Sequence, residues 1–80
     1  NTVGAISSNI LFYTQKGELQ IIGSLSSPLQ EITVYGAGGE IIAKRNGLNS
    51  VCETFTLPSG LYIIKAKSDK AMKISKVTIY

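Results

Sequence analysis

Apolar and polar residues alternate along most of this 80-residue chain, which is the pattern of strands that bury one face. In residues 30–35, for example, Ile32 and Val34 fall in one phase, and polar or aromatic residues fall in the other. Short segments rich in Gly, Pro, Asn or Ser separate such runs and predict turns. No segment shows a sustained helical stripe. We therefore expect about seven strands, at residues 10–14, 18–22, 30–35, 40–44, 51–57, 61–66 and 72–80.

Two of these strands depart from simple alternation. Residues 61–66 are apolar in both phases at their start, which predicts a central strand covered on both faces near that end. The last strand changes phase between two apolar pairs, Met72 with Ile74 and Val77 with Ile79. A β-bulge near residues 75–76, or a strand buried on both sides, would accommodate this change.

The turn signals place the strands in order along the chain. Residues 36–39 contain three glycines and predict a tight turn ending at Gly39. Residues 58–60 read Pro-Ser-Gly, so Pro58 ends one strand and Gly60 permits a sharp return. After this turn, three alternating residues are expected in the core: Tyr62, Ile64 and Ala66. A buried Tyr62 then needs a hydrogen-bond partner for its hydroxyl group.

Composition agrees with one small β-domain spanning residues 1–80. The chain has 11 Ile, 4 Val and 6 Thr, so 21 of its 80 residues are β-branched. It has no His, the commonest general base and metal ligand, so we expect neither an enzyme nor a metal or cofactor site. The single Cys52 excludes an internal disulfide. We expect it to be a small buried residue, whereas an exposed Cys52 would permit an intermolecular bridge.

Positive charge gathers in the last quarter of the chain. Residues 1–60 carry three basic and four acidic side chains, a net charge of −1, whereas residues 61–80 carry five lysines and one aspartate, a net charge of +4. Lys65 and Lys67 share a phase and should stand on the outer face of their strand. Lys70 and Lys73 lie at or just past the turn that precedes the last strand. These lysines either contact an anionic partner or form a solvated face that protects an edge strand from aggregation.

Four segments stand in an order that resembles a known family. They read Ile-Thr-Val-Tyr at residues 32–35 with a turn to Gly39, Phe-Thr-Leu-Pro ending at Pro58, Ser-Gly-Leu-Tyr-Ile-Ile-Lys-Ala at 59–66, and Lys-Ile-Ser-Lys-Val-Thr-Ile at 73–79. Together they resemble the type A C-terminal sorting domain of the Bacteroidetes type IX secretion system. The resemblance covers about residues 28–80, with Gly36 where that family usually has Asn or Asp, and with Tyr80 in place of a basic last residue.

The resemblance implies an immunoglobulin-like antiparallel β-sandwich that acts as a non-catalytic signal. Such a domain directs its parent protein from the periplasm through the outer membrane to the cell surface. There a sortase usually cleaves upstream of the domain, here near Asn1, and attaches the parent to anionic lipopolysaccharide. The implied partners are therefore the translocon and the sortase and attachment components. The residues expected to carry recognition are Gly60, Leu61, Tyr62, Ile63, Lys65, Lys73, Lys76, Val77, Ile79 and Tyr80, with Gly39 and Pro58 forming turns.

Two other interpretations remain open on the residues alone. An immunoglobulin-like or fibronectin-type accessory module of a secreted protein would share the fold, and could contact oligosaccharides through Tyr13 or Tyr35. A small five-stranded barrel that binds single-stranded nucleic acid would gather Phe12, Tyr13, Tyr35 and Tyr62 with lysines on one face. We expect no nucleic-acid partner. Exposed strand edges favour a strand-exchanged homodimer of the isolated domain.

Overall fold

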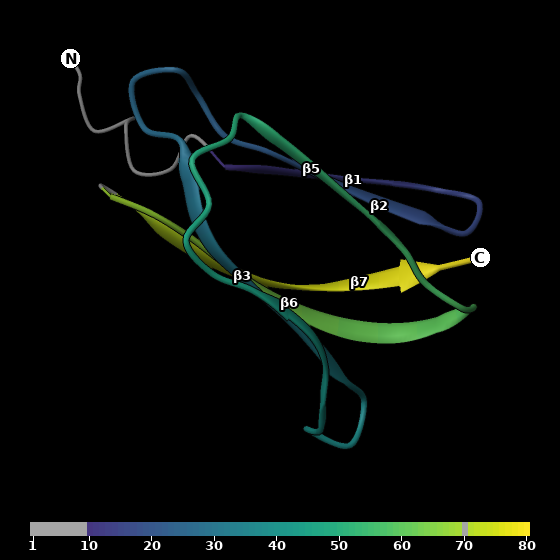
Figure 1. Ribbon diagram of the computed structural model, residues 1–80. Coiled ribbons are helices and arrows are strands. Elements are labelled where there is room, and N and C mark those ends of the chain that lie inside the picture. The colour runs from purple at the N-terminus through teal and green to yellow at the C-terminus, as the bar shows by residue number, and fades with distance from the viewer. Residues whose placement is uncertain (1–9, 70) are drawn as a thin grey trace, which may run out of the picture.

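The computed structural model describes residues 10–69 and 71–80, which form antiparallel strands joined by turns (Figure 1). All seven expected strands are present, and their ends differ from the predicted ends by at most two residues. The strands are β1 (Leu11–Gln15), β2 (Glu18–Ile22), β3 (Leu29–Gly36), β4 (Ile41–Arg45), β5 (Cys52–Thr56), β6 (Gly60–Ser68) and β7 (Met72–Ile79). The all-β prediction is therefore confirmed.

The strands form two facing sheets, one of three strands in the order β1-β2-β5 and one of four in the order β4-β3-β6-β7. In an immunoglobulin constant domain the third and fourth strands belong to different sheets. The fourth strand lies in the four-stranded sheet, and the third lies in the three-stranded sheet. Here the fourth strand, β4, pairs instead with β3. The arrangement is thus an immunoglobulin-like sandwich whose fourth strand has moved to the other sheet.

The core lies between the two sheets and follows the alternation of the sequence. Its buried apolar residues are Ile10, Leu19, Ile21, Leu29, Ile32, Val34, Phe55, Leu57, Tyr62, Ile64, Ala66 and Ile79. The alternation predicted for β6 is confirmed, because Tyr62, Ile64 and Ala66 all point inward. The Tyr62 hydroxyl donates a hydrogen bond of 2.7 Å to the Pro58 carbonyl, which supplies the partner that its burial requires.

Main-chain and hydroxyl contacts join the sheets at both ends. In the β1–β2 turn, the Gly17 amide donates to the main-chain oxygen of Tyr80 at 3.0 Å, and the Gly17 carbonyl accepts from the Leu57 amide at 3.0 Å. At the opposite end, the Ser27 hydroxyl lies 2.7 Å from Ser68 Oγ and 2.9 Å from Asp69 Oδ1. The end of β7 and the β6–β7 turn are therefore each attached to the other half of the sandwich.

An ion pair closes the side of the sandwich where β4 and β5 form the sheet edges. Arg45 Nη1 donates to Glu53 Oε1 at 2.6 Å, and the Ser50 hydroxyl donates to the second oxygen, Oε2, at 2.6 Å. The Arg45 guanidinium also lies 3.9 Å from the centroid of the Phe55 ring, within cation–π range. These hydrogen bonds, from Ser50 first and then Arg45, lower the pKa of the Glu53 carboxyl below its ordinary value of 4.5.

The lowered pKa of Glu53 predicts a pH-dependent contribution to stability. Because the folded state favours the charged carboxylate, this contribution is present above about pH 5 and is lost as the pH falls through the lowered pKa. At pH 7, Glu53→Gln should cost about 1 kcal/mol, since Arg45 is partly exposed and its pairing is screened by solvent. Urea denaturation at pH 7 and pH 3 should give a smaller difference between the two proteins at pH 3. A constant difference would contradict this prediction.

The predicted β-bulge in the last strand is wrong. The register between β6 and β7 runs without a shift from Gly60 opposite Ile79 to Lys67 opposite Met72. The inward phase of β7 therefore consists of Lys73, Ser75, Val77 and Ile79. The apolar residues Met72 and Ile74 fall in the outward phase, and both are exposed.

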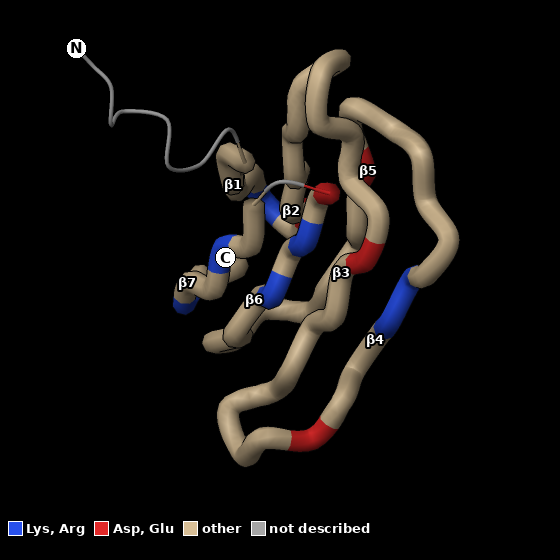
Figure 2. Tube along the Cα trace, turned by 90° about the vertical axis from the view of Figure 1, so that its left-hand side faces the viewer, with Lys and Arg blue, Asp and Glu red and all other residues tan. Residues whose placement is uncertain are grey.

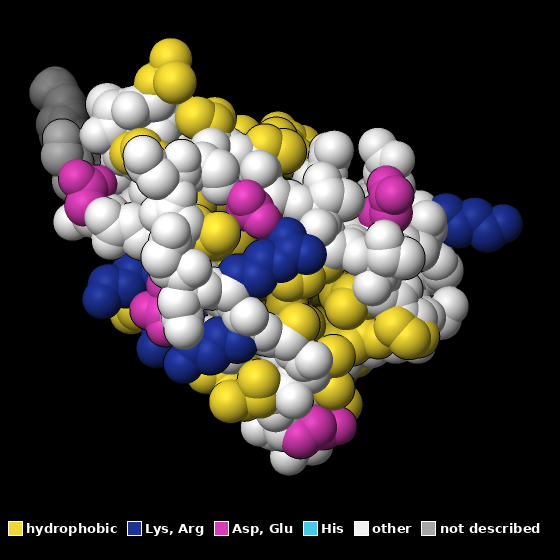
Figure 3. Space-filling view, viewed as in Figure 1, with side chains coloured by type: hydrophobic (Ala, Val, Ile, Leu, Met, Phe, Trp, Pro, Cys, Tyr) yellow, Lys and Arg dark blue, Asp and Glu magenta, His cyan; other side chains and the backbone are white. Residues whose placement is uncertain are grey.

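The prediction that β6 is covered on both faces is also wrong. β6 is a central strand, with β3 on one side and β7 on the other, but within residues 10–69 and 71–80 the three-stranded sheet covers its inner face and no strand covers its outer face. Leu61 in the outward phase is exposed, and Ile63 is half-buried. Figure 3 looks onto the edges formed by β4 and β5, where hydrophobic and basic side chains lie next to one another at the surface.

Cys52 is exposed at the start of β5, contrary to the expectation of a buried residue. It pairs in register with Ile22, next to the inward-facing pair of Glu53 and Ile21, and so its side chain points to the outer face. The sequence places Cys52 and the exposed Thr54 and Thr56 in one phase, and this phase faces solvent.

We predict that the Cys52 thiol of the folded protein reacts with a disulfide reagent such as Ellman's reagent. The rate should be close to that of a cysteine in an unfolded peptide, because the side chain is exposed and makes no disulfide. Labelling should also be nearly as fast in native buffer as in 6 M urea. Slow native labelling that urea accelerates at least tenfold would contradict the exposed position.

Candidate functional site

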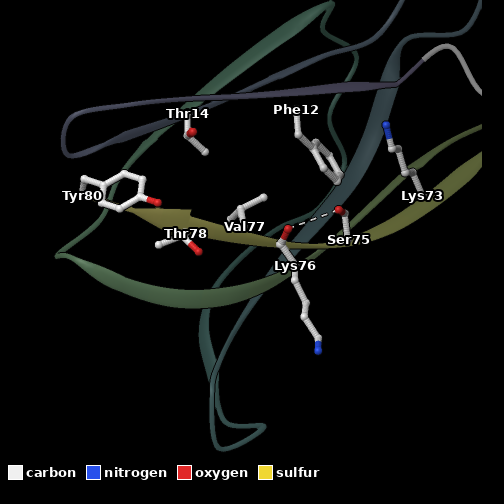
Figure 4. A pocket seen from close by; sticks show the side chains of 8 residues that line it. All are labelled: Phe12, Thr14, Lys73, Ser75, Lys76, Val77, Thr78 and Tyr80. Carbon is white, nitrogen blue, oxygen red and sulfur yellow. Dashed lines mark hydrogen bonds between the residues drawn. The ribbon is translucent and has the colours of Figure 1, made fainter.

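A groove runs between the two sheets on the side where β1 and β7 form the edges (Figure 4). Its volume is about 410 Å³. It is lined by Phe12 and Thr14 from β1 and by Lys73, Ser75, Lys76, Val77, Thr78 and the following Tyr80 from β7 and its end. The opposite side of the sandwich is closed by the ion pair of Arg45 and Glu53, so the open side is the one formed by β7.

The groove has a lysine beside an aromatic ring at one end and a second aromatic ring at the other. Lys73 Nζ donates to the Ile10 carbonyl at 3.1 Å and lies 5.1 Å from the centroid of the Phe12 ring. These contacts hold the ammonium group beside an aromatic face. Figure 4 shows Tyr80 at the far end of the groove from Lys73, with Val77 between them. Ser75 lies in the inward phase of β7, and its hydroxyl lies 3.3 Å from the Lys76 carbonyl.

This geometry suits an extended chain with acidic or carbonyl groups better than it suits chemistry on a small molecule. β7 is an edge strand, so among the described residues one row of its main-chain groups has no neighbouring strand in the sheet. Within the part of the groove that the structure describes there is no Asp or Glu, and Lys73 holds its ammonium group there, whereas the side chain of Lys76 points to the outer face. Strand addition of this kind draws affinity from main-chain hydrogen bonds and specificity from side-chain pockets.

The structure divides the expected recognition residues among three environments. Lys73, Lys76, Val77 and Tyr80 lie together along the groove. Leu61, Ile63 and Lys65 lie in the outward phase of β6, and Tyr62 and Ile79 are core residues. Of the other groove residues, Thr14 was missed, Phe12 was considered for the barrel interpretation alone, and Ser75 and Thr78 were not singled out within the last strand. The alternation of the sequence predicts on which face of its own strand a residue lies. The order of the strands in the two sheets decides which of these residues lie next to one another.

The turn residues singled out in the sequence occupy turns. Gly39 has a φ of 92°, and its amide donates to the Gly36 carbonyl at 3.0 Å in the β3–β4 turn. Gly60 has a φ of 156° where β6 begins, a backbone conformation that favours glycine. Pro58 is exposed, and its carbonyl anchors the Tyr62 hydroxyl. The Leu-Pro-Ser-Gly-Leu-Tyr segment therefore forms a fixed corner between β5 and β6.

The described lysines of the C-terminal quarter lie on two sides of the large sheet, three on its outer face and one in the groove. Lys65 and Lys67 point outward on β6, as expected, and Lys76 points outward on β7, whereas Lys73 lies in the inward phase within the groove. Figure 2 shows basic residues on β4, β6 and β7, three of the four strands of the larger sheet. Lys70 and the cleavage position expected near Asn1 lie outside the described residues.

Within residues 10–69 and 71–80, no three His, Cys, Asp or Glu residues group closely enough to hold a metal ion. The same residues include no helix with the length and apolar character needed to cross a membrane. The fold thus defines a small immunoglobulin-like β-sandwich domain. Comparison with known protein families gave no matching family, and no curated protein is similar enough in sequence to count as a relative.

The barrel interpretation does not fit this architecture. Five strands closing into one barrel were expected, but the chain forms seven strands in two sheets. The four aromatic residues required on one face are also separated. Phe12 lines the groove, Tyr13 is exposed on the outer face of the small sheet, Tyr35 lies on the outer face of the large sheet, and Tyr62 is in the core.

Proposed function

We propose that this chain is a non-catalytic sorting domain that directs its parent protein through a type IX secretion system to the cell surface. Translocon and sortase components recognise it, and the parent is attached to anionic lipopolysaccharide. The proposal rests on the resemblance of residues 28–80 to the type A sorting domains. One structural observation supports it further: the free edge of β7 borders a groove with Lys73 at one end and Tyr80 at the other.

In this proposal, recognition takes place at the C-terminal hairpin. The corner at Pro58 and Tyr62 sets the start of β6, and β6 in turn positions β7 through eight register pairs. A strand of the machinery adds to the free edge of β7, and its side chains enter the groove. The same free edges favour strand exchange between two copies of the isolated domain.

The test is to fuse residues 1–80 to a reporter protein in a Bacteroidetes host and locate the reporter. We expect the reporter at the cell surface. A double variant, Lys73→Gln with Tyr80→Ser, changes both ends of the groove and should leave the reporter in the periplasm. The matched control, Lys16→Gln with Tyr13→Ser, makes the same chemical changes at exposed positions on β1 and its turn. It should retain surface display.

The two double variants must both fold for this comparison, which circular dichroism and urea denaturation can verify. Equal surface display of both variants would contradict recognition through the groove. Periplasmic retention of the unaltered fusion would contradict the sorting role itself.

An accessory module of a secreted protein is the second candidate. Tyr13 and Leu11 stand exposed on the outer face of β1, where an aromatic side chain can contact a sugar ring. A sorting domain of this family ends its polypeptide, whereas an accessory module can lie within one. Several hundred further residues after Tyr80 in the parent gene would favour the accessory module.

A further inference from the structure

The outer face of the four-stranded sheet alternates lysines with exposed apolar residues. In the β6–β7 ribbon, each outward lysine lies opposite an apolar residue on the neighbouring strand. The pairs are Ile63 with Lys76, Lys65 with Ile74, and Lys67 with Met72. The exposed fractions are 46% for Leu61, 54% for Met72, 58% for Ile74 and 59% for Ile41 at the start of β4. These are large apolar side chains that the fold leaves in water.

This outer face is also positively charged. Its strand positions carry Lys44, Lys65, Lys67 and Lys76 against one acid, Glu31, whose carboxylate lies 3.8 Å from Lys44 Nζ. Four lysines and one glutamate give the face a net charge of +3. A second copy of the domain would bring like charges together if it packed here face to face, so the occupant of this surface is anionic.

The type of basic residue on this outer face distinguishes between two kinds of partner, an anionic lipid surface and an acidic protein. Protein interfaces are enriched in arginine, depleted of lysine, and place charges on a rim around an apolar centre. Here all four cations are lysines, and three of them sit in register with apolar residues. The one arginine of this sheet, Arg45, is turned inward and bound to Glu53.

A surface that mixes lysines with apolar residues can bind at the boundary between the headgroups and the acyl chains of a bilayer. Lysine stems lie along apolar groups while their ammonium ends reach lipid phosphates, and the apolar side chains enter the acyl boundary. Thr33 lies on this outer face between its register neighbours Lys44 and Lys65. It is nevertheless buried, as expected if the lysine stems lie along the sheet and cover it. Tyr35 on the same face is of the type enriched at membrane interfaces.

We propose that the outer face of the four-stranded sheet binds an anionic lipid surface, with Ile41, Leu61, Met72 and Ile74 as inserting side chains and Lys65, Lys67 and Lys76 contacting headgroup phosphates. This contact lies on the face of the sheet. It does not depend on the sorting role, which uses the edge of β7 and its groove.

The test is co-sedimentation of the 80-residue chain with vesicles of equal parts phosphatidylglycerol and phosphatidylcholine, compared with phosphatidylcholine alone. We expect binding to the anionic vesicles only, and weaker binding as salt rises. Lys76→Gln should weaken binding about fivefold, the value expected for one lysine near such a surface. Lys16→Gln, with the same charge change in the β1–β2 turn, should leave binding unchanged.

A second pair of variants tests the apolar contribution. Ile74→Ser should weaken vesicle binding several-fold, whereas Leu25→Ser, at a residue 87% exposed in the loop after β2, should not. Equal effects of Lys76→Gln and Lys16→Gln would show attraction by net charge alone and overturn the proposal. Failure to bind the vesicles, with or without binding to polyglutamate, would also overturn it, and polyglutamate binding would point to an acidic protein partner. These measurements report vesicle binding and not secretion. A protein that fails to bind vesicles therefore leaves the sorting proposal standing, and a reporter that is not sorted leaves the lipid-binding proposal standing.

Discussion

Replacing Ile64 with alanine is expected to lower the free energy of unfolding by about 3–4 kcal/mol, the range for a buried isoleucine whose cavity collapses only in part. Ile64 is fully buried in β6, where it pairs with Val34 on one side and Ser75 on the other. A domain of this size has a total stability of roughly 4–12 kcal/mol. The substitution should therefore remove a large share of that stability.

The neighbouring residue supplies the matched control. Ile63 occupies the next position of the same strand and faces outward. Ile63→Ala makes the same chemical change with the same loss of strand propensity, but it should cost less than about 1 kcal/mol. Urea denaturation of both variants measures the difference directly. Equal losses would mean that the outer face of the sheet is as well packed as the core.

Burial on one face was predictable because the period of a strand is two. Ile32 and Val34 in β3, and Tyr62, Ile64 and Ala66 in β6, follow the alternation of the sequence. The turn residues were predictable for a similar local reason, since a tight turn needs particular backbone angles. Neither inference required knowledge of the other sheet.

The errors arose where apolar residues face solvent. The phase change between Met72 with Ile74 and Val77 with Ile79 predicts a bulge in the last strand, and the apolar start of residues 61–66 predicts that β6 is covered on both faces. In fact the register of β7 is regular, and its inward phase begins with Lys73 and Ser75. Counting back in steps of two from the buried Ile79 would have placed Lys73 inward. An exposed apolar residue cannot be distinguished from a buried one by its type alone.

The groove could not be found in the sequence for a different reason. Its residues come from β1 and β7, which are separated by more than fifty positions and belong to different sheets. They meet because both strands are edges on the same side of the sandwich. The strand order that brings them together is a property of the whole chain.

Removing residues 74–80 is expected to destroy the cooperative fold and to leave a fused reporter in the periplasm. The deletion takes away most of β7, including the buried Ile79, and exposes one edge of β6. It also removes the hydrogen bond from the Gly17 amide to the main-chain oxygen of Tyr80, one of the contacts that join the sheets. Loss of the sharp urea transition and of the β-type circular dichroism spectrum would report the unfolding.

This truncation removes the fold and the groove together. Comparison with the double variant Lys73→Gln with Tyr80→Ser, which changes the groove alone, separates the two effects. If the sorting machinery recognises β7 and its groove, both proteins stay in the periplasm, although only the truncated one is unfolded. If it needs only a folded sandwich, the truncated protein alone fails to reach the surface. Normal surface display of the truncated fusion would contradict the sorting role of the last strand, whatever the double variant does.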